Sequence, residues 1–222
     1  MTRPTSTMAA TPTTPTTTPT TTPATTPTTQ PQTTTTTSTT TTPAPTQTPI
    51  QEDTNLKMSS AICGGSLIHP RYILTAAHCA AKFQQEPTKL KIRCGEWDTQ
   101  NQTEPRPHQD RYVQNLDIHP EFNPRNLAND WAVLYTAQNF DLQAHIDTVC
   151  LPQPEELFDF QTCFATGWGK DEFGAAGNYQ VVLKEIDLPV VGHDQCEASL
   201  RTTRLGKRFQ LDDSFICAGG VD

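Results

Sequence analysis

Short stretches of alternating apolar and polar residues recur through the body of the chain. The clearest is Leu90-Lys91-Ile92-Arg93-Cys94, whose alternation is typical of a half-buried strand. Upstream, residues 63–74 indicate two short strands around the turn His69-Pro70-Arg71, because proline favours a tight reversal of the chain. These patterns predict a protein built mainly from short strands.

The same pattern predicts further strands and one helix downstream. A strand at residues 112–118 carries on one face Tyr112, Gln114, Leu116 and Ile118. More strands are predicted at residues 131–135 and 180–191, and the glycines within residues 163–169 permit the tight path of a flanking loop. A short helix is predicted from His193 to Leu205, ending at Gly206, since glycine readily adopts the left-handed conformation that stops a helix. The fold class expected from these elements is all-β.

The first 49 residues differ sharply from the rest, with 27 Thr, 10 Pro and no Leu, Ile, Val, Phe, Trp, Tyr or Cys. Such a segment buries too little apolar surface to offset its ordering entropy, so it is predicted to be disordered. An O-glycosylated, mucin-like stalk and an unmodified tail fit this composition equally well. We therefore expect a Thr/Pro-rich stalk at residues 1–49, a polar linker at 50–62 and one folded domain at 63–222.

Charge and hydropathy exclude several classes of partner. The net charge is −8, which argues against nucleic acid or an anionic membrane as a general partner. No run of about 18 apolar residues exists, so no membrane span is predicted.

The seven cysteines instead favour an oxidising, extracellular compartment. The first residues lack the apolar core of a secretory signal, so no signal peptide is visible and the prediction of secretion depends on the cysteines.

Two residues are candidates for catalytic chemistry. His78 follows the apolar run Tyr72-Ile73-Leu74 and the small residues of Thr75-Ala76-Ala77, and it precedes Cys79. A histidine at the end of a strand and beside a cysteine is a candidate catalytic imidazole held by a disulfide. Asp130 lies immediately before the apolar run at residues 131–135, which places a carboxylate at the mouth of a buried strand.

Other polar residues are given simpler interpretations. Asn101-Gln102-Thr103 is a glycosylation sequon, so Asn101 is a candidate modification site in a secreted protein. Glu96 and Asp98 form too sparse a ligand set for calcium, so a solvated loop is expected and no metal is predicted. The basic residues Arg201, Arg204, Lys207 and Arg208 are interpreted as a solvated helix face in preference to a binding patch.

The segment from Cys63 to Cys79 resembles the active-site histidine segment of the trypsin/chymotrypsin serine proteases. The resemblance implies a chymotrypsin-like double six-stranded barrel, with the second barrel incomplete at the C-terminus and the first strand missing or altered. It makes His78 the general base and Asp130 the carboxylate that orients it. The nucleophilic serine of the family should follow Cys217, and no residue up to Asp222 fills that role.

The resemblance also implies a pattern of disulfides. Two pairs are expected, Cys63 with Cys79 and Cys196 with Cys217. The usual partners of Cys150 and Cys163 are absent from this sequence, and no partner is assigned to Cys94.

Within the family, the chain is most similar to arthropod non-catalytic serine protease homologues of the clip type, which are masquerade-like and related to prophenoloxidase-activating cofactors. The stretches that carry this similarity are residues 94–100, 165–170 with 173–174, 203–206 and 215–220. The resemblance implies a binding cofactor or regulator in an extracellular proteolytic cascade of innate immunity such as melanisation, with other proteases or zymogens as partners and no small-molecule cofactor.

The alternatives are a trypsin-like endopeptidase whose nucleophile-bearing part is absent from this sequence, and a non-functional fragment or Thr/Pro-rich stalk protein. As written, the chain is predicted to be inactive.

Overall fold

The structure is a computed structural model, and it describes residues 48–52, 61–101, 103–172 and 174–219. Most of the predicted Thr/Pro stalk lies outside these residues. The described part is built mainly from strands, which confirms the predicted fold class.

Seven strands form one antiparallel sheet in the order β2-β1-β5-β6-β7-β4-β3. Their bounds are β1 (Ile50–Glu52), β2 (Ala61–Cys63), β3 (Ser66–His69), β4 (Tyr72–Thr75), β5 (Leu90–Cys94), β6 (Gln109–Ile118) and β7 (Ala132–Thr136). A short helix, α1 (Ala77–Ala80), follows β4, and two 3-10 turns at Ala81–Phe83 and Pro87–Lys89 lead into β5.

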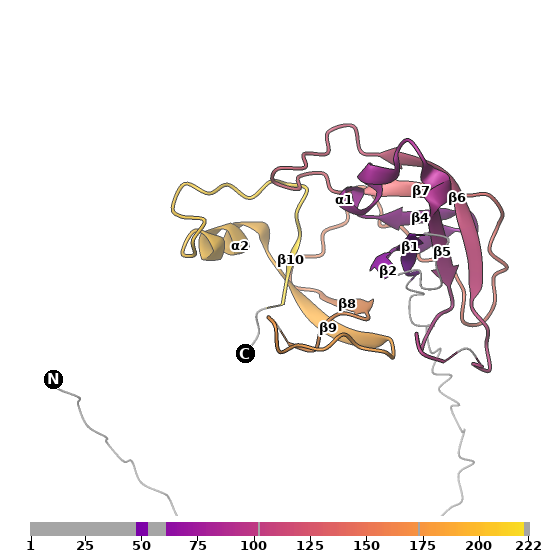
Figure 1. Ribbon diagram of the computed structural model, residues 1–222. Helices are drawn as coiled ribbons and strands as arrows, with labels where there is room; N and C mark the ends of the chain where they lie inside the picture. The colour runs from indigo at the N-terminus through magenta and orange to yellow at the C-terminus, as the bar shows by residue number, and fades with distance from the viewer. Residues whose placement is uncertain (1–47, 53–60, 102, 173, 220–222) are drawn as a thin grey trace, which may run out of the picture. The chain divides into compact units, whose positions relative to one another are not determined.

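The later part of the chain forms a three-stranded antiparallel sheet in the order β10-β9-β8. Its strands are β8 (Thr162–Gly167), β9 (Lys184–Val191) and β10 (Cys217–Ala218), and the helix α2 (His193–Leu200) follows β9. In Figure 1, β8 and β9 run side by side as a ribbon.

The hydrophobic core of the described residues belongs to the seven-stranded sheet. Alternate residues of β5 and β7 point into it, including Ile92 and Leu134, each 0% exposed. In contrast, β8 has no buried residue and exposes Phe164. The core that supports the candidate site is therefore assembled from β1 and β3 to β7, with α1 and residues such as Phe83, Phe140 and Ile146 packed against them.

The strand before the core begins earlier than the sequence pattern predicted. Residues 50–62 were expected to be a polar linker, but Ile50 is 1% exposed and pairs with Ile92 of β5. Thr48 is also fully buried, and its backbone N–H and its hydroxyl both donate to the carbonyl of Gly65, at 2.9 and 2.7 Å. Backbone hydrogen bonding recruits this polar segment into the sheet, which a hydrophobicity pattern does not reveal.

Gly65 is needed because the backbone at this position lies close to β4. A Cβ at this position would lie 2.8 Å from Cγ2 of Ile73 and 2.9 Å from the carbonyl oxygen of Leu74. Any side chain here would push β4 away from the segment that carries Thr48.

The predicted face of β6 is wrong in part. Tyr112 is 49% exposed, and the buried residues are Val113 and Leu116, three positions apart. The pairing of β6 with β7 shifts register between Val113 and Asn115. A bulge of this kind adds a residue to one strand and exchanges its two faces, so simple alternation fails on either side of it.

An ion-pair network joins β5 to β6. Arg93 and Asp110 are directly paired residues, and Nε and Nη2 of Arg93 donate to the two carboxylate oxygens of Asp110 at 2.8 and 3.0 Å. Lys91 is a second cation at this carboxylate, with its Nζ 3.3 Å from Oδ2 of Asp110. Burial opposes ionisation of Asp110, but hydrogen bonds and charge from Arg93 and Lys91 outweigh it and hold the pKa of this carboxyl below its ordinary value.

Asp110→Asn should lower the free energy of unfolding by about 1 kcal/mol at neutral pH. Because the folded-state pKa of Asp110 is lowered, its ionised form stabilises the fold above the ordinary carboxyl pKa of about 4, and this stabilisation is lost as the pH falls through the lower folded value. Urea unfolding across a pH series should show the difference from wild type shrinking in acid. Asp187→Asn, at an exposed residue of β9 for which no ion pair is found among the described residues, is the matched control and should be nearly neutral. A loss in Asp110→Asn that is the same at every pH would contradict this account.

Candidate functional site

His78 is placed by the end of β4 and the start of α1. Ile73 on β4 and Ala77 on α1 are each 0% exposed and anchor the segment in the core. The small side chains around Ala77 let the helix approach the sheet closely. His78, the next residue, turns outward with its side chain 53% exposed.

Asp130 lies near His78 because it precedes β7, the strand that pairs with β4. These strands are antiparallel, with Thr75 opposite Ala132. The segment that follows β4 and the segment that precedes β7 therefore lie at the same end of the sheet. Asn129 precedes Asp130 with a left-handed φ of 56°, which asparagine tolerates better than most residues. The backbone N–H of Asn129 donates to the hydroxyl of Ser214 at 2.9 Å.

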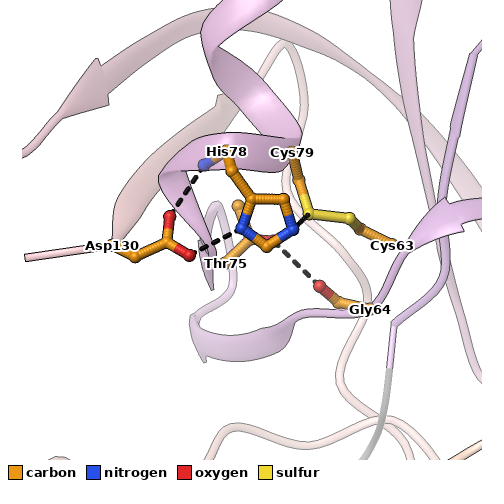
Figure 2. Close-up of a disulfide and its surroundings, with 6 residues drawn as sticks. All are labelled: Cys63, Gly64, Thr75, His78, Cys79 and Asp130. Carbon is orange, nitrogen blue, oxygen red and sulfur yellow. Dashed lines mark hydrogen bonds and ion pairs between the residues drawn. A yellow bond between two sulfur atoms is a disulfide. The ribbon is translucent and has the colours of Figure 1, made fainter. Parts of the chain in front are cut away.

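The carboxylate of Asp130 holds His78 at two points (Figure 2). Oδ1 accepts the backbone N–H of His78 at 2.8 Å, and Oδ2 lies 2.6 Å from the ring nitrogen Nδ1. An ionised carboxylate only accepts hydrogen bonds, so Nδ1 carries the proton of a neutral ring. This contact leaves Nε2 as the basic nitrogen.

The basic nitrogen of His78 faces sulfur. Nε2 lies 3.4 Å from Sγ of Cys79, which forms a disulfide with Cys63. Next to this bond, the hydroxyl of Thr75 donates to the carbonyl of Gly64 at 2.8 Å (Figure 2). The disulfide and this hydrogen bond tie the chain after β2 to the segment that carries His78. The second expected pair is also a disulfide, joining Cys196 of α2 to Cys217 of β10.

Metal binding at this place is disfavoured by the disulfide. Sγ of Cys63, Sγ of Cys79 and a ring nitrogen of His78 lie within 4.8 Å of one another, a spacing that suits a metal ion. The two sulfur atoms are bonded to each other, however, and only thiolates make good metal ligands.

No hydroxyl side chain among the described residues forms a hydrogen bond with the ring of His78. The hydroxyl of Ser214 accepts the backbone N–H of Asn129, and no hydrogen bond is found between it and the imidazole. Of the catalytic elements implied by the resemblance, the described chain therefore assembles an imidazole and its orienting carboxylate. Such a pair can hold and move a proton, but acyl transfer also needs a nucleophile and aligned oxyanion donors.

Glu96 was expected to lie in a solvated loop, and this expectation is wrong. Its side chain is only 3% exposed, and Oε2 lies 3.1 Å from Nη1 of Arg93 and 3.4 Å from Nδ1 of His108. A buried carboxylate is stable when it is paired in this way. The carboxylate of Asp98 accepts the backbone N–H of Gln100, two residues further on, at 3.0 Å.

The remaining candidates are separate from the imidazole. Asn101 is exposed, and its side-chain oxygen accepts the backbone N–H and the hydroxyl of Thr103. Cys94, Cys150 and Cys163 carry free thiols. Burial raises the pKa of the Cys94 thiol, so this group stays protonated inside the core.

One contact and one backbone feature of the site were missed from the sequence. Ser214 is 85 positions from Asn129, so no local pattern connects them. The left-handed backbone at Asn129 had a weak signal, because asparagine is favoured in that conformation.

Comparison with known proteins shows what the chain is similar to. Residues 33–222 match the family described as Trypsin. The chain is 46% identical over 171 residues to phenoloxidase-activating factor 2 of Galleria mellonella, covering 77% of this chain and 55% of that protein. It is 41% identical over 159 residues to inactive CLIP domain-containing serine protease A28 of Anopheles gambiae, covering 72% of this chain and 40% of that protein. For protease A8 of the same mosquito, also named as inactive, the identity is 39% over 170 residues, covering 76% of this chain and 45% of that protein. The chain thus spans about half the length of these curated relatives.

Asp130→Asn should change which ring nitrogen of His78 carries the proton. The amide oxygen would keep accepting the backbone N–H, so the NH₂ group would face Nδ1 and force the proton onto Nε2. Nitrogen-15 NMR of the neutral ring should show the two nitrogen signals exchanged. Asp117→Asn, which neutralises the carboxylate that accepts from the Tyr135 hydroxyl, is the control and should leave them unchanged. Unchanged signals in Asp130→Asn would mean that the carboxylate does not set the tautomer.

Removing the Cys63–Cys79 disulfide should destabilise the fold. The bond closes a loop with a sequence separation of 16, for which loop entropy gives about 3 kcal/mol. The double variant Cys63→Ala/Cys79→Ala should show this loss in urea unfolding without reductant. Cys150→Ser, at an exposed free thiol, should be neutral. Equal stability of the double variant and wild type would show that the bond is not formed or not structural.

Proposed function

Because this chain belongs to the trypsin family of serine proteases, we propose that it is a non-catalytic homologue that acts as a binding cofactor or regulator in an extracellular proteolytic cascade. The expected trypsin-like fold is confirmed by the family match, and the expected similarity to inactive clip-type homologues of insects is confirmed by the relatives.

The observation that carries the proposal is the surroundings of the imidazole. Asp130 holds Nδ1 of His78, but Nε2 lies against the sulfur of a closed disulfide, and no described hydroxyl hydrogen-bonds to the ring. In the described part of the chain the histidine and the aspartate have no nucleophile beside them, an arrangement that leaves the family's fold available for binding without acyl transfer.

The names of the relatives support the role. Two of them are named as inactive serine proteases, and a third is named as a factor that activates phenoloxidase. We assign this chain to the same kind of cascade, with proteases or their zymogens as its partners.

An extracellular location fits the two disulfides, which persist in oxidising compartments. In the part of the chain that the structure describes, no helix combines the length and apolarity required to cross a bilayer.

A second candidate is a trypsin-like endopeptidase, and the formed His78–Asp130 pair favours it. In that case the imidazole would serve a nucleophile supplied by residues outside the described part. The residue at the nucleophile position of a full-length transcript separates the two candidates, because serine there favours the endopeptidase and glycine favours the cofactor.

Purified chain of residues 1–222 should hydrolyse neither peptide amides nor esters, and it should not react with a fluorophosphonate probe of active-site serines. In a reconstituted mixture of phenoloxidase zymogen and its activating protease, the same protein should raise the rate of phenoloxidase formation. The His78→Ala variant should keep this effect, because the proposed role needs no proton transfer. His78 is half exposed, so its truncation should disturb the fold little.

Either of two results would oppose the proposal. Turnover that disappears in His78→Ala would make the protein an enzyme. A cofactor effect that is absent from wild type would remove the regulatory role while leaving the lack of catalysis unexplained.

A further inference from the structure

The basic residues after α2 lie on a structured loop and not on a helix. The sequence pattern extended the helix to Leu205, whereas α2 ends at Leu200. Residues 201–209, here called the basic loop, form a series of turns that includes Gly206 in a left-handed conformation with φ of 81°. The interpretation of these cations as a solvated helix face is therefore wrong.

Hydrogen bonds hold the basic loop in one shape. Arg201 spans it, pairing through Nη2 with Glu197 at 2.6 Å and donating from Nε to the carbonyl of Phe209 at 2.7 Å. The backbone N–H of Gly206 donates to the carbonyl of Thr203, and that of Phe209 donates to Gly206. A loop ordered in advance loses little conformational entropy when it binds a partner.

Three cations of the loop are left without counter-charge. Arg204, Lys207 and Arg208 are exposed, and in the described part of the chain none of them has an ion pair or a side-chain hydrogen bond. Some cations elsewhere in the described chain are paired, as Arg93 is with Asp110 and Arg111 is with Asp141.

The nearby carboxylates of Glu197, Asp212 and Asp213 form no ion pair with these three cations in the described chain. Glu197 contacts Arg201 and also accepts the backbone N–H of Leu211 at 2.8 Å. Asp212 accepts the backbone N–H of Ser214, and Asp213 lies 3.7 Å from Nε2 of His193. The positive charge of the loop is therefore not neutralised within its own neighbourhood.

We propose that the basic loop binds a short acidic segment of a protein partner, with Arg204, Lys207 and Arg208 as its charged contacts. Arginine guanidinium groups pair with carboxylates through two parallel hydrogen bonds, which gives orientation as well as attraction. Leu205 is 42% exposed in the middle of the three cations and supplies an apolar contact of the kind found in protein interfaces. This proposal rests on the proposed function, since it names the surface through which a non-catalytic homologue engages its partner.

A long polyanion fits the loop less well than an acidic peptide. Binding of nucleic acid or a sulfated polysaccharide gains from the release of many counterions, which requires many cations along a path. The chain carries a net charge of −8, so a long polyanion that extends beyond the three cations meets repulsion. A short acidic segment satisfies the loop and stays clear of the remaining surface.

The test uses the full chain and a fluorescein-labelled peptide rich in Asp and Glu with a central Leu. Fluorescence anisotropy should show binding that weakens as salt increases. The triple variant Arg204→Ala/Lys207→Ala/Arg208→Ala should bind at least about tenfold more weakly. The matched control, Arg106→Ala/Arg125→Ala/Lys184→Ala, removes the same charge from exposed positions outside the loop and should bind as wild type does.

A charge-conserving variant guards against misfolding. Arg204→Lys/Arg208→Lys keeps the net charge and the fold but removes the paired hydrogen bonds, so it should bind with intermediate affinity. Equal binding by wild type and the triple alanine variant would overturn the proposal, as would equal losses in the triple variant and its control. Tighter binding of a heparin oligosaccharide than of the peptide would overturn the assignment to a protein partner.

The cascade assay separates this inference from the proposed function. If wild type raises phenoloxidase formation and the triple alanine variant does not, both stand. If both proteins raise it equally, the basic loop is not the contact surface although the proposed function holds. If neither raises it, the proposed function fails, and the peptide titration alone decides whether the loop binds acidic segments.

Discussion

The pairing of β4 with β7 is the constraint on which the candidate site depends. His78 and Asp130 are 52 positions apart, and they meet because these two antiparallel strands end together. The carboxylate then reinforces the arrangement, since it bonds both the backbone and the ring of His78. Loss of the strand pairing would separate the residues, so the buried residues of the sheet support the site as directly as the polar ones do.

The geometry of the site separates the orientation of the imidazole from the further requirements of catalysis. Orientation of an imidazole by a carboxylate is a structural feature, held here by a hydrogen bond of 2.6 Å and flanked by a disulfide. Catalysis adds the requirement that an oxygen nucleophile meet the other ring nitrogen, where the described chain places sulfur. Binding functions need only a stable surface, and the basic loop, ordered by Arg201, supplies one whose charge is opposite to that of the chain as a whole.

Much of the fold was predictable where local pattern and tertiary environment agree. In β5 the alternation of residues 90–94 matches their burial at every position, because one face packs on the core. The sequence pattern and the observed structure disagree at three positions. The bulge in β6 exchanged its faces, the polar segment around Thr48 joined the sheet through backbone hydrogen bonds, and Glu96 became buried by pairing with Arg93. Each of these depends on a neighbour distant in space or on a defect in the repeat, and a window along the sequence detects neither.

The sequence alone indicated the strand-rich class through its local patterns, and its resemblance to the serine proteases implied the disulfide pairs and the pairing of His78 with Asp130. The tertiary structure decided which atoms meet. It placed both oxygens of Asp130 on His78, set the sulfur of Cys79 against the remaining ring nitrogen, and ended α2 early enough to expose Arg204, Lys207 and Arg208 on a braced loop. These outcomes follow from strand register, backbone turns and competition for charge partners, which are properties of the folded chain and not of any single segment.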